Sequence, residues 1–521
     1  MSDATITYVV LGAAVVVFAS GRVPAAITAI GVALALWATG VLELDQALAG
    51  FGDPTVIFIA ALFVVSEGLD ATGVTAWVGQ RLIASAGGSR TRLIVLIMTL
   101  VALLTALVNV NGAVAALVPV VVVVAVRVGR PPSQLLMPLA FGAHAGSLLA
   151  LTGTPVNVIV SDAAADAGVG RFGFFEFALV GVPLVAGTIA IVALLGGRLL
   201  PARTPRTIPP DFSGYARTVA RQYALDHRED ELVTRRAGVA EVVIPPRSPL
   251  VGTAMFPGMV TDSGDLVVLA VRRGGEDLGP DPVDLAEGDV LLLRGTWTAL
   301  DEHLEDPAVR VVDSPALVRR QAVPLGPGAA RAIAVLVAMV VLLVTGAVPA
   351  AVAGLLAACA IVLLRLMTVE HAFRSIAWTT VVLVGGMISL STAMTQSGAA
   401  ADLAHDLVGL VDDAGPYALL AALFALTAVL GQLISNMATA LIVIPIALSA
   451  AAEMDVPAKP VLMAVTVSAA AAFLTPVATP ANLMVMGPGA YRFGDYWRLG
   501  LPLLALFGLV AVLLVPVIWS L

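Results

Sequence analysis

Two short motifs with the pattern Thr-Pro-x-Asn are the residues of this chain whose types and spacing first suggest chemistry. They read TPVN at residues 154–157 and TPAN at residues 479–482, each beside long apolar stretches. Proline removes one helical hydrogen bond and leaves a carbonyl upstream free, and the small residues Gly153 and Ala478 leave room for close approach. We therefore predict a broken helix at each motif, whose N–H groups attract anions and whose free carbonyl groups attract cations.

Two further breaks lie inside apolar segments, where NVNG occupies residues 109–112 and SNM occupies residues 435–437. The apolar legs beside them are each about 16 residues long, or about 24 Å as a helix. That is short for a bilayer core of about 30 Å. We predict that residues 92–126 and 417–452 form re-entrant helical hairpins whose tips meet near the membrane midplane. A single polar-kinked spanning helix in each place is the alternative.

Hydroxyl and amide side chains gather at these four breaks, and broken helices are where many transporters bind their substrate. The candidate substrate-binding residues are Asn109, Asn111, Thr154, Asn157, Ser435, Asn436, Thr479 and Asn482. Because the breaks carry no arginine or lysine, an anion held there depends on helix dipoles and co-bound cations. His144 precedes the first Thr-Pro motif and is a candidate proton carrier, since ionisable residues inside a membrane are usually functional. A histidine that only hydrogen-bonds a neighbouring helix is the alternative.

The elements that position these residues are expected to be membrane helices. Of the 521 residues, 59% are hydrophobic and only 12% are charged, whereas soluble domains contain about 25% charged residues. Apolar segments long enough to cross a bilayer lie on both sides of one polar stretch, and residues 461–478 are among them. Cys359 is the single cysteine, which excludes an internal disulfide.

The polar stretch, residues 201–320, holds 33 of the 64 charged residues. It contains short alternating segments such as EVVIPP, DLVVLAVRR and DVLLLRG, separated by Gly, Pro and Asp, and this pattern indicates β-strands. We predict a soluble α+β insert at residues 236–313. Linkers at residues 201–235 and 314–328 are expected to join it to the membrane segments.

The chain also contains an internal repeat. Pro155 and Pro480 lie 325 residues apart, and several other landmarks hold nearly the same offset. We predict a duplication, with a first membrane repeat at residues 1–200 and a second at residues 329–521. The positive-inside rule then predicts that the two copies have opposite orientations, that the insert is cytoplasmic, and that both termini lie outside.

Both halves resemble the divalent anion/sodium symporter family of the ion transporter superfamily. The motifs that carry the resemblance are SNMATA at residues 435–440, PVATPAN at residues 476–482, and residues 50–69, which begin GFGDP. The resemblance implies an all-α polytopic membrane protein with an inverted repeat. It also implies an elevator mechanism, in which hairpins and broken helices slide as a block against a dimeric scaffold. The sodium-site residues that it implies are Asn109, Gly153, Ser435, Asn436 and Ala478. The chain departs from the family at NVN in the first hairpin and at Met437 in the second.

The insert is similar to a TrkA-C domain, the C-terminal domain of RCK regulators. The matching segments are EVVIPPRSPLVG at residues 241–252, VRRGG at residues 271–275 and EGDVLL at residues 287–292. The resemblance implies dimerisation and the binding of a small regulatory ligand such as a nucleotide. A module that only dimerises is the alternative.

Together these features predict a secondary active transporter of the plasma membrane, surrounded by lipid, that moves a small divalent anion with sodium. Sulfate is the first expected substrate, because a TrkA-C insert resembles the inorganic-anion branch of this fold, and a dicarboxylate is the second. A sodium/proton or metalloid-anion exchanger is the main alternative, and a channel or sensor gated by the insert is another. No nucleophile–base pair or metal cluster is recognisable, so we expect no enzyme activity, no organic cofactor and no nucleic-acid partner.

Overall fold

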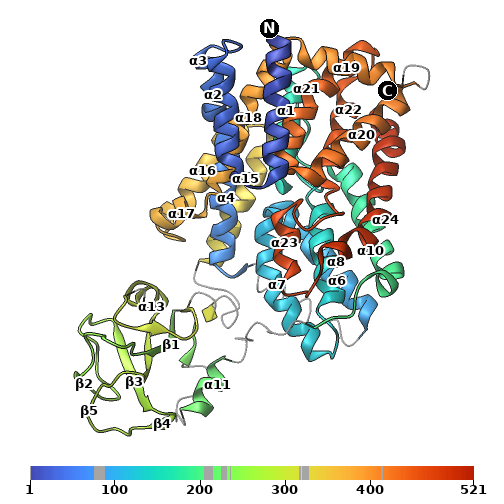
Figure 1. Cartoon of the computed structure of the whole chain (residues 1–521). Helices are drawn as coiled ribbons and strands as arrows, with labels where there is room; N and C mark the ends of the chain where they lie inside the picture. The colour runs from blue at the N-terminus through green and yellow to red at the C-terminus, as the bar shows by residue number, and fades with distance from the viewer. Residues whose placement is uncertain are drawn as a thin grey trace. The chain divides into compact units, whose positions relative to one another are not determined.

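The computed structural model describes residues 2–74, 89–204, 215–223, 232–234, 236–304, 306–315, 318–319, 328–411 and 415–521. These residues form two compact units, which Figure 1 shows in one view. The first unit contains the helices on both sides of the polar stretch. The second unit contains the strands of the insert.

Helices make up the first unit. Before the insert they are α1 (Asp3–Ser20), α2 (Ala25–Ala38), α3 (Leu44–Ala49), η1 (Gly50–Gly52), α4 (Pro54–Ala71), α6 (Arg90–Leu107), α7 (Val110–Arg127), α8 (Ser133–Gly146), η2 (Leu151–Gly153), α9 (Pro155–Asp166) and α10 (Ala178–Leu199). After it they are α15 (Ala329–Thr345), α16 (Ala350–Leu363), α17 (Val369–Ser375), α18 (Trp378–Gln396), α19 (Ala399–Gly409), α20 (Pro416–Leu433), α21 (Asn436–Glu453), α22 (Ala458–Ala470), α23 (Pro480–Met486), η5 (Phe493–Asp495), α24 (Tyr496–Leu509), η6 (Val510–Leu514) and α25 (Val515–Ile518). Within the described residues, eight helical segments are long and apolar enough to cross a membrane.

The helices after the insert follow the order and spacing of those before it. α2 and α16 begin at residues 25 and 350, and α8 and α22 begin at residues 133 and 458, both 325 positions apart. The starts of α7 and α21, at residues 110 and 436, are 326 positions apart. This spacing agrees with the offset in the sequence, while the opposite orientation of the two halves stays a prediction.

Each predicted hairpin is two helices with a short break between them. α6 and α7 are separated by Val108 and Asn109, and α20 and α21 by Ile434 and Ser435. All four legs have 18 residues, so each is about 27 Å long and longer than the sequence predicted. The two legs of each hairpin contact each other. The breaks are confirmed, and re-entry from one membrane face stays a prediction.

The prediction of a span at residues 461–478 is wrong. α22 ends at Ala470, and the chain is not helical again until α23 begins at Pro480. Gln432 of α20 stabilises this unwound segment, because its Oε1 accepts a hydrogen bond from the Leu474 amide at 3.0 Å. Pro476 has no N–H to give to a continuing helix. The second break is therefore a long loop rather than a kink.

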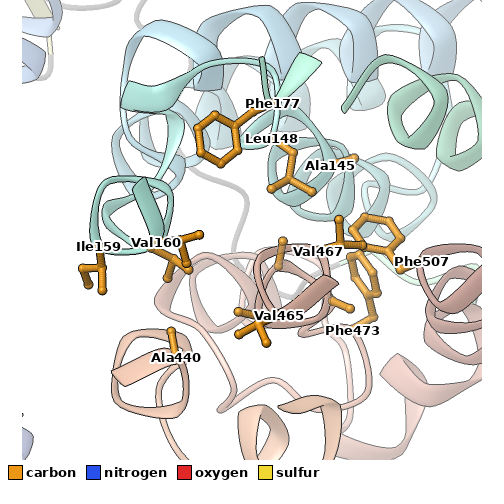
Figure 2. Packing of buried hydrophobic residues seen from close by; sticks show 14 of the residues in the cluster. Ala145, Leu148, Ile159, Val160, Phe177, Ala440, Val465, Val467, Phe473 and Phe507 are labelled. Atoms are coloured by element: carbon orange, nitrogen blue, oxygen red, sulfur yellow. The ribbon is translucent and has the colours of Figure 1, made fainter. Parts of the chain in front are cut away.

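Apolar side chains from both halves form one continuous core. Figure 2 shows part of it, with Leu148 and Val160 of the first half facing residues of the second half such as Val465 and Val467 of α22. Phe473 follows α22 and packs edge-to-face against Phe141 of α8 and Phe507 of α24, with ring centroids 5.0 and 4.9 Å apart. Such aromatic pairs add to the energy of burial, so the two halves are held together where their helices break.

The second unit contains two β-sheets and, in its described residues, short helices. Its strands are β1 (Ala237–Val243), β2 (Ala254–Met255), β3 (Leu266–Arg273), β4 (Glu276–Asp277), β5 (Val283–Asp284), β6 (Val290–Thr296) and β7 (Arg310–Val311), and its helices are α11 (Tyr215–Gln222) and α13 (Trp297–His303). The larger sheet has the order β4-β3-β6-β1-β7 and is antiparallel, and β2 pairs with β5. The three strands predicted from sequence are β1, β3 and β6.

The second unit extends upstream of the predicted boundary at residue 236. Tyr215, Val219 and Tyr223, on and just after α11, are buried in its core. The Tyr223 hydroxyl donates a hydrogen bond to Glu241 Oε1 at 2.6 Å. α11 therefore covers the sheet, although the sequence suggested only a linker there.

An ion pair inside this unit gives a testable prediction about stability. Nε and Nη2 of Arg273 each donate to the buried carboxylate of Asp289 at 2.8 Å, and this contact holds the pKa of Asp289 below its usual value. We expect Asp289→Asn to lower the free energy of unfolding of this unit by about 2 kcal/mol. The carboxylate's contribution is present above the unfolded pKa of about 3.9 and is lost as the pH falls through the lower folded value.

Hydrogen exchange of the β6 amides in the full-length protein measures both effects. Asp265→Asn is the matched control, because Asp265 contacts His303 at the protein surface and surface pairs contribute little. Equal loss of protection in the two variants would contradict the prediction.

Candidate functional site

One cavity in the first unit collects the tips of both hairpins and both Thr-Pro breaks. It has about 100 Å³ of open space, and since one water needs roughly 10–15 Å³ of such space, a small ion with water fits. The predicted residues that line it are Asn109, Asn111, His144, Gly153, Thr154, Ser435, Asn436, Ala478 and Thr479. Among the described residues, those lining the cavity include no arginine, lysine, aspartate or glutamate.

Four helices begin at this cavity: α7, α9, α21 and α23. In each, the residue before the helix caps it by accepting a hydrogen bond from the first turn: Asn109 from Gly112 N (2.9 Å), Thr154 from Val156 N (3.5 Å), Ser435 from Ala438 N (3.3 Å) and Thr479 from Asn482 N (3.3 Å). Pro155 and Pro480 occupy the first helical position, where a missing N–H is tolerated. Because helix N-termini carry partial positive charge, their convergence favours an anion.

Asn157 and Asn482 hold the backbone that precedes each Thr-Pro break. Each side-chain amide donates two hydrogen bonds to carbonyl groups of the unwound segment: Asn157 to Ser147 and Ala150 (both 2.9 Å), and Asn482 to Ala472 and Thr475 (2.8 and 3.1 Å). Both asparagines are fully buried and lie behind the cavity wall. Neither is among the residues that line the cavity, so we expect them to position the break, whereas the sequence predicts direct contact with a substrate.

The first break is packed so closely that residue 153 must be glycine. A Cβ on Gly153 would lie 2.2 Å from the carbonyl oxygen of Ser147, which also accepts the Asn157 hydrogen bond. The close approach predicted from the small residue at this position is confirmed.

His144 connects the first half to the second break. Its Nε2 lies 3.0 Å from Thr479 Oγ1 and 3.3 Å from Asn482 Oδ1. Because the Asn482 NH₂ faces two carbonyl groups, its Oδ1 faces the imidazole, and an amide oxygen only accepts. Nε2 therefore carries the hydrogen. The single Nε2–H is shared between Asn482 Oδ1 and Thr479 Oγ1, and Thr479 Oγ1 also accepts from the Asn482 N–H, so its own hydroxyl hydrogen is left for an acceptor in the cavity.

The second hairpin contains oxygens without donors. Asn436 Oδ1 and Thr439 Oγ1 are buried and have no hydrogen-bond partner in the part of the chain that the structure describes, and the same holds for Thr475 Oγ1 in the unwound loop. In the first hairpin, Asn109 Oδ1 already accepts from Gly112 N at 2.9 Å, although Asn157 Oδ1, behind the cavity, also lacks a described donor. A buried oxygen without a donor is unfavourable, and hard cations bind such oxygens.

Thr439 is one of the hydroxyl side chains that the sequence places at the second hairpin break, whereas Thr475 is not among the residues predicted from sequence. Thr439 had a usable signal, because it lies three positions after Asn436 on α21 and side chains at that spacing share a helix face. Thr475 had none, since its segment was predicted to be helical.

Comparisons with known proteins identify a transporter family. The sequence matches the family described as CitMHS, citrate transporter, over residues 15–455 and 415–521. The uncharacterized transporter YfbS of Escherichia coli K12 is 31% identical over 98% of each chain. The probable sodium/sulfate cotransporter 3 of Chlamydomonas reinhardtii is 26% identical over 51% of this chain and 30% of its own.

A solved structure agrees at the level of the fold. The YdaH transporter of Alcanivorax borkumensis aligns with a TM-score of 0.51 and 16% identity, covering 93% of this chain and 88% of its own. Together with the apolar helices and the family match, this indicates a multi-pass membrane transporter rather than an enzyme.

The two asparagine clamps give a prediction. We expect Asn157→Ala and Asn482→Ala each to cost on the order of 2 kcal/mol, because two buried carbonyl groups lose their donor. Asn157→Asp and Asn482→Asp should be worse, since a carboxylate oxygen would then face two carbonyl oxygens. The melting temperature of the purified full-length protein measures the effect. Asn111→Asp is the control, because Asn111 lines the cavity, and a clamp variant that melts with the wild type would refute this role.

Proposed function

The chain belongs to the CitMHS citrate transporter family, and on this basis we propose that it is a secondary active transporter that carries a small divalent oxyanion together with sodium. Three relatives named sodium/sulfate cotransporters, at 26% to 27% identity over 51% of the chain, support sulfate as the first substrate. A dicarboxylate is the second choice. The family name supports an organic anion as strongly as these relatives support sulfate, so both substrates are tested below.

The observation that carries the proposal is that the Thr479 hydroxyl offers a hydrogen-bond donor to the cavity. The Asn482 N–H and the shared Nε2–H of His144 both point towards the threonine oxygen, so the free hydroxyl hydrogen suits an oxyanion. The helix N-termini around the cavity add partial positive charge. A cation at Thr479 would meet a hydroxyl whose lone pairs are already used.

Sodium has a better position at the second hairpin. We assign Asn436 Oδ1 and Thr439 Oγ1 to this site, with carbonyl groups near Ala478 as further ligands. A second sodium site near Asn109 and Gly153 would depend more on backbone oxygens, because the Asn109 side chain is hydrogen-bonded to Ser66 and Gly112. Two monovalent cations would balance the charge of a divalent anion.

The proposed movement is of the elevator type, in which hairpins and broken helices move as a block. Two polar contacts link α4 to these elements: the Thr55 hydroxyl donates to Asp162 of α9, and the Asn109 amide donates to Ser66. The proposal includes a dimeric scaffold, a plasma-membrane location with a cytoplasmic insert, and a small regulatory ligand such as a nucleotide at the insert.

Uptake by the purified protein in proteoliposomes tests this function. Labelled sulfate and labelled succinate are offered with an inward sodium gradient, and with potassium in place of sodium. Sodium-dependent accumulation of either anion supports symport. A sodium/proton exchanger would instead change the luminal pH when sodium is added without an anion, and that result would overturn the proposal.

Substitutions of Thr479 can separate the effect of its hydroxyl group from the effect of its side-chain volume. Thr479→Val keeps the side-chain volume and removes the donor, so uptake of the anion should fall by at least about tenfold. Thr479→Ser keeps the hydroxyl and should retain most of the activity. Equal activity of the valine and serine variants would show that Thr479 does not bind the anion.

Asn436 gives a prediction about coupling. Asn436→Ala removes a buried oxygen that has no donor in the described part of the chain, so sodium-dependent uptake should be lost. Asn109→Ala should raise the sodium concentration for half-maximal uptake only a few-fold, on the order of 1 kcal/mol. The sodium dependence of initial uptake rates measures both. An unchanged sodium requirement in Asn436→Ala would place the cation elsewhere.

A further inference from the structure

The guanidinium of Arg90, outside the transport cavity, lies against two glycines of α10. A Cβ on Gly196 would be 3.2 Å from Arg90 Nη2, and one on Gly197 would be 3.1 Å from Nη1. Because the two glycines have no side chain, the guanidinium of Arg90 can pack directly against α10, near the start of α6 and the end of α10.

This guanidinium lacks a counter-charge in the described structure. Its Nε and Nη2 are buried, and no described residue accepts a hydrogen bond from them. Arg130, in the loop between α7 and α8, is close enough to repel it. The chain just before Arg90, residues 75–88, contains no aspartate or glutamate. Buried donors and like charges both favour an external anion at this place.

We propose that Arg90 and Arg130 bind the phosphate group of an anionic phospholipid. A guanidinium binds phosphate through two parallel hydrogen bonds, and basic pockets between transmembrane helices bind lipid headgroups. Both α6 and α10 are apolar enough to cross a membrane.

The surface next to the two glycines favours a lipid over free phosphate. Leu194, one turn before Gly197, is 79% exposed, and Val95, on the second turn of α6, is 37% exposed. Acyl chains can lie along these side chains while the phosphate reaches Arg90. Inorganic phosphate gains nothing from this apolar surface.

Thermal stability of the full-length protein in detergent tests the proposal. Phosphatidylglycerol should raise the melting temperature of the wild type, and phosphatidylcholine, which has no net charge, should raise it much less. Arg90→Gln should need at least about tenfold more phosphatidylglycerol for the same rise. Arg92→Gln is the matched control, because Arg92 lies in the same helical turn and is exposed, and it should respond like the wild type.

Three results would overturn the proposal: an Arg90→Gln response equal to the wild type, an Arg92→Gln loss as large as that of Arg90→Gln, or an equal rise with inorganic phosphate. Gly197→Ala keeps every charge and displaces the guanidinium, and it should also weaken the lipid response. This second variant decides the question if Arg90→Gln does not fold. None of these outcomes depends on which anion the protein transports.

Discussion

Unwound backbone inside an apolar protein has no water to bind, so its N–H and C=O groups need hydrogen-bond partners within the protein. The arrangement of the whole site depends on how these partners are supplied. Asn157 and Asn482 supply them by donating to two carbonyl groups each. Because these bonds fix the unwound segments, α9 and α23 can begin at the cavity with their N–H groups directed to it. The Tyr496 hydroxyl extends the support by donating to the Asn482 carbonyl at 2.7 Å.

The two halves share this support and differ in what they present to the cavity. His144 lines it in the first half, and Ala469, which is 325 positions later, lines it in the second. At the hairpin tips, Val110 and Asn436 occupy equivalent positions. In the proposed site, the Thr479 hydroxyl for the anion and the Asn436 oxygen for the cation therefore both come from the second half, and His144 of the first half supports Thr479. A cavity made from two identical halves would not have this asymmetry.

Local chemistry made the breaks predictable from the sequence. Pro155 and Pro480 cannot continue a helix, and a cap such as Ser435 favours a helix start, so the position of each break follows from nearby residues. The insert's longer strands were readable for the same reason, since alternation is a local pattern. The constant offset added information that no single motif contains.

What the sequence did not predict depends on partners far along the chain. α22 ends early because the side chains of Gln432 and Asn482 form hydrogen bonds with backbone groups of the segment after it. α11 is part of the insert because Tyr223 reaches Glu241. The sequence shows Asn157 only as a polar residue at a break, and its role follows from the two carbonyl groups that it binds in the structure.

The proposed coupling follows from the charges that this cavity lacks. A divalent anion alone in an apolar interior carries a large desolvation cost, and among the described lining residues no arginine or lysine offsets it. A fixed arginine would stabilise the anion but would leave a buried positive charge when the protein returns empty. Mobile cations remove this difficulty, because they enter with the anion and leave with it. Both the loaded and the empty cavity are then close to neutral. An anion that binds without its cations leaves a net charge in the cavity, and the desolvation cost of that charge opposes its movement through the membrane. In this mechanism, the absence of a fixed charge is what makes transport obligatorily coupled.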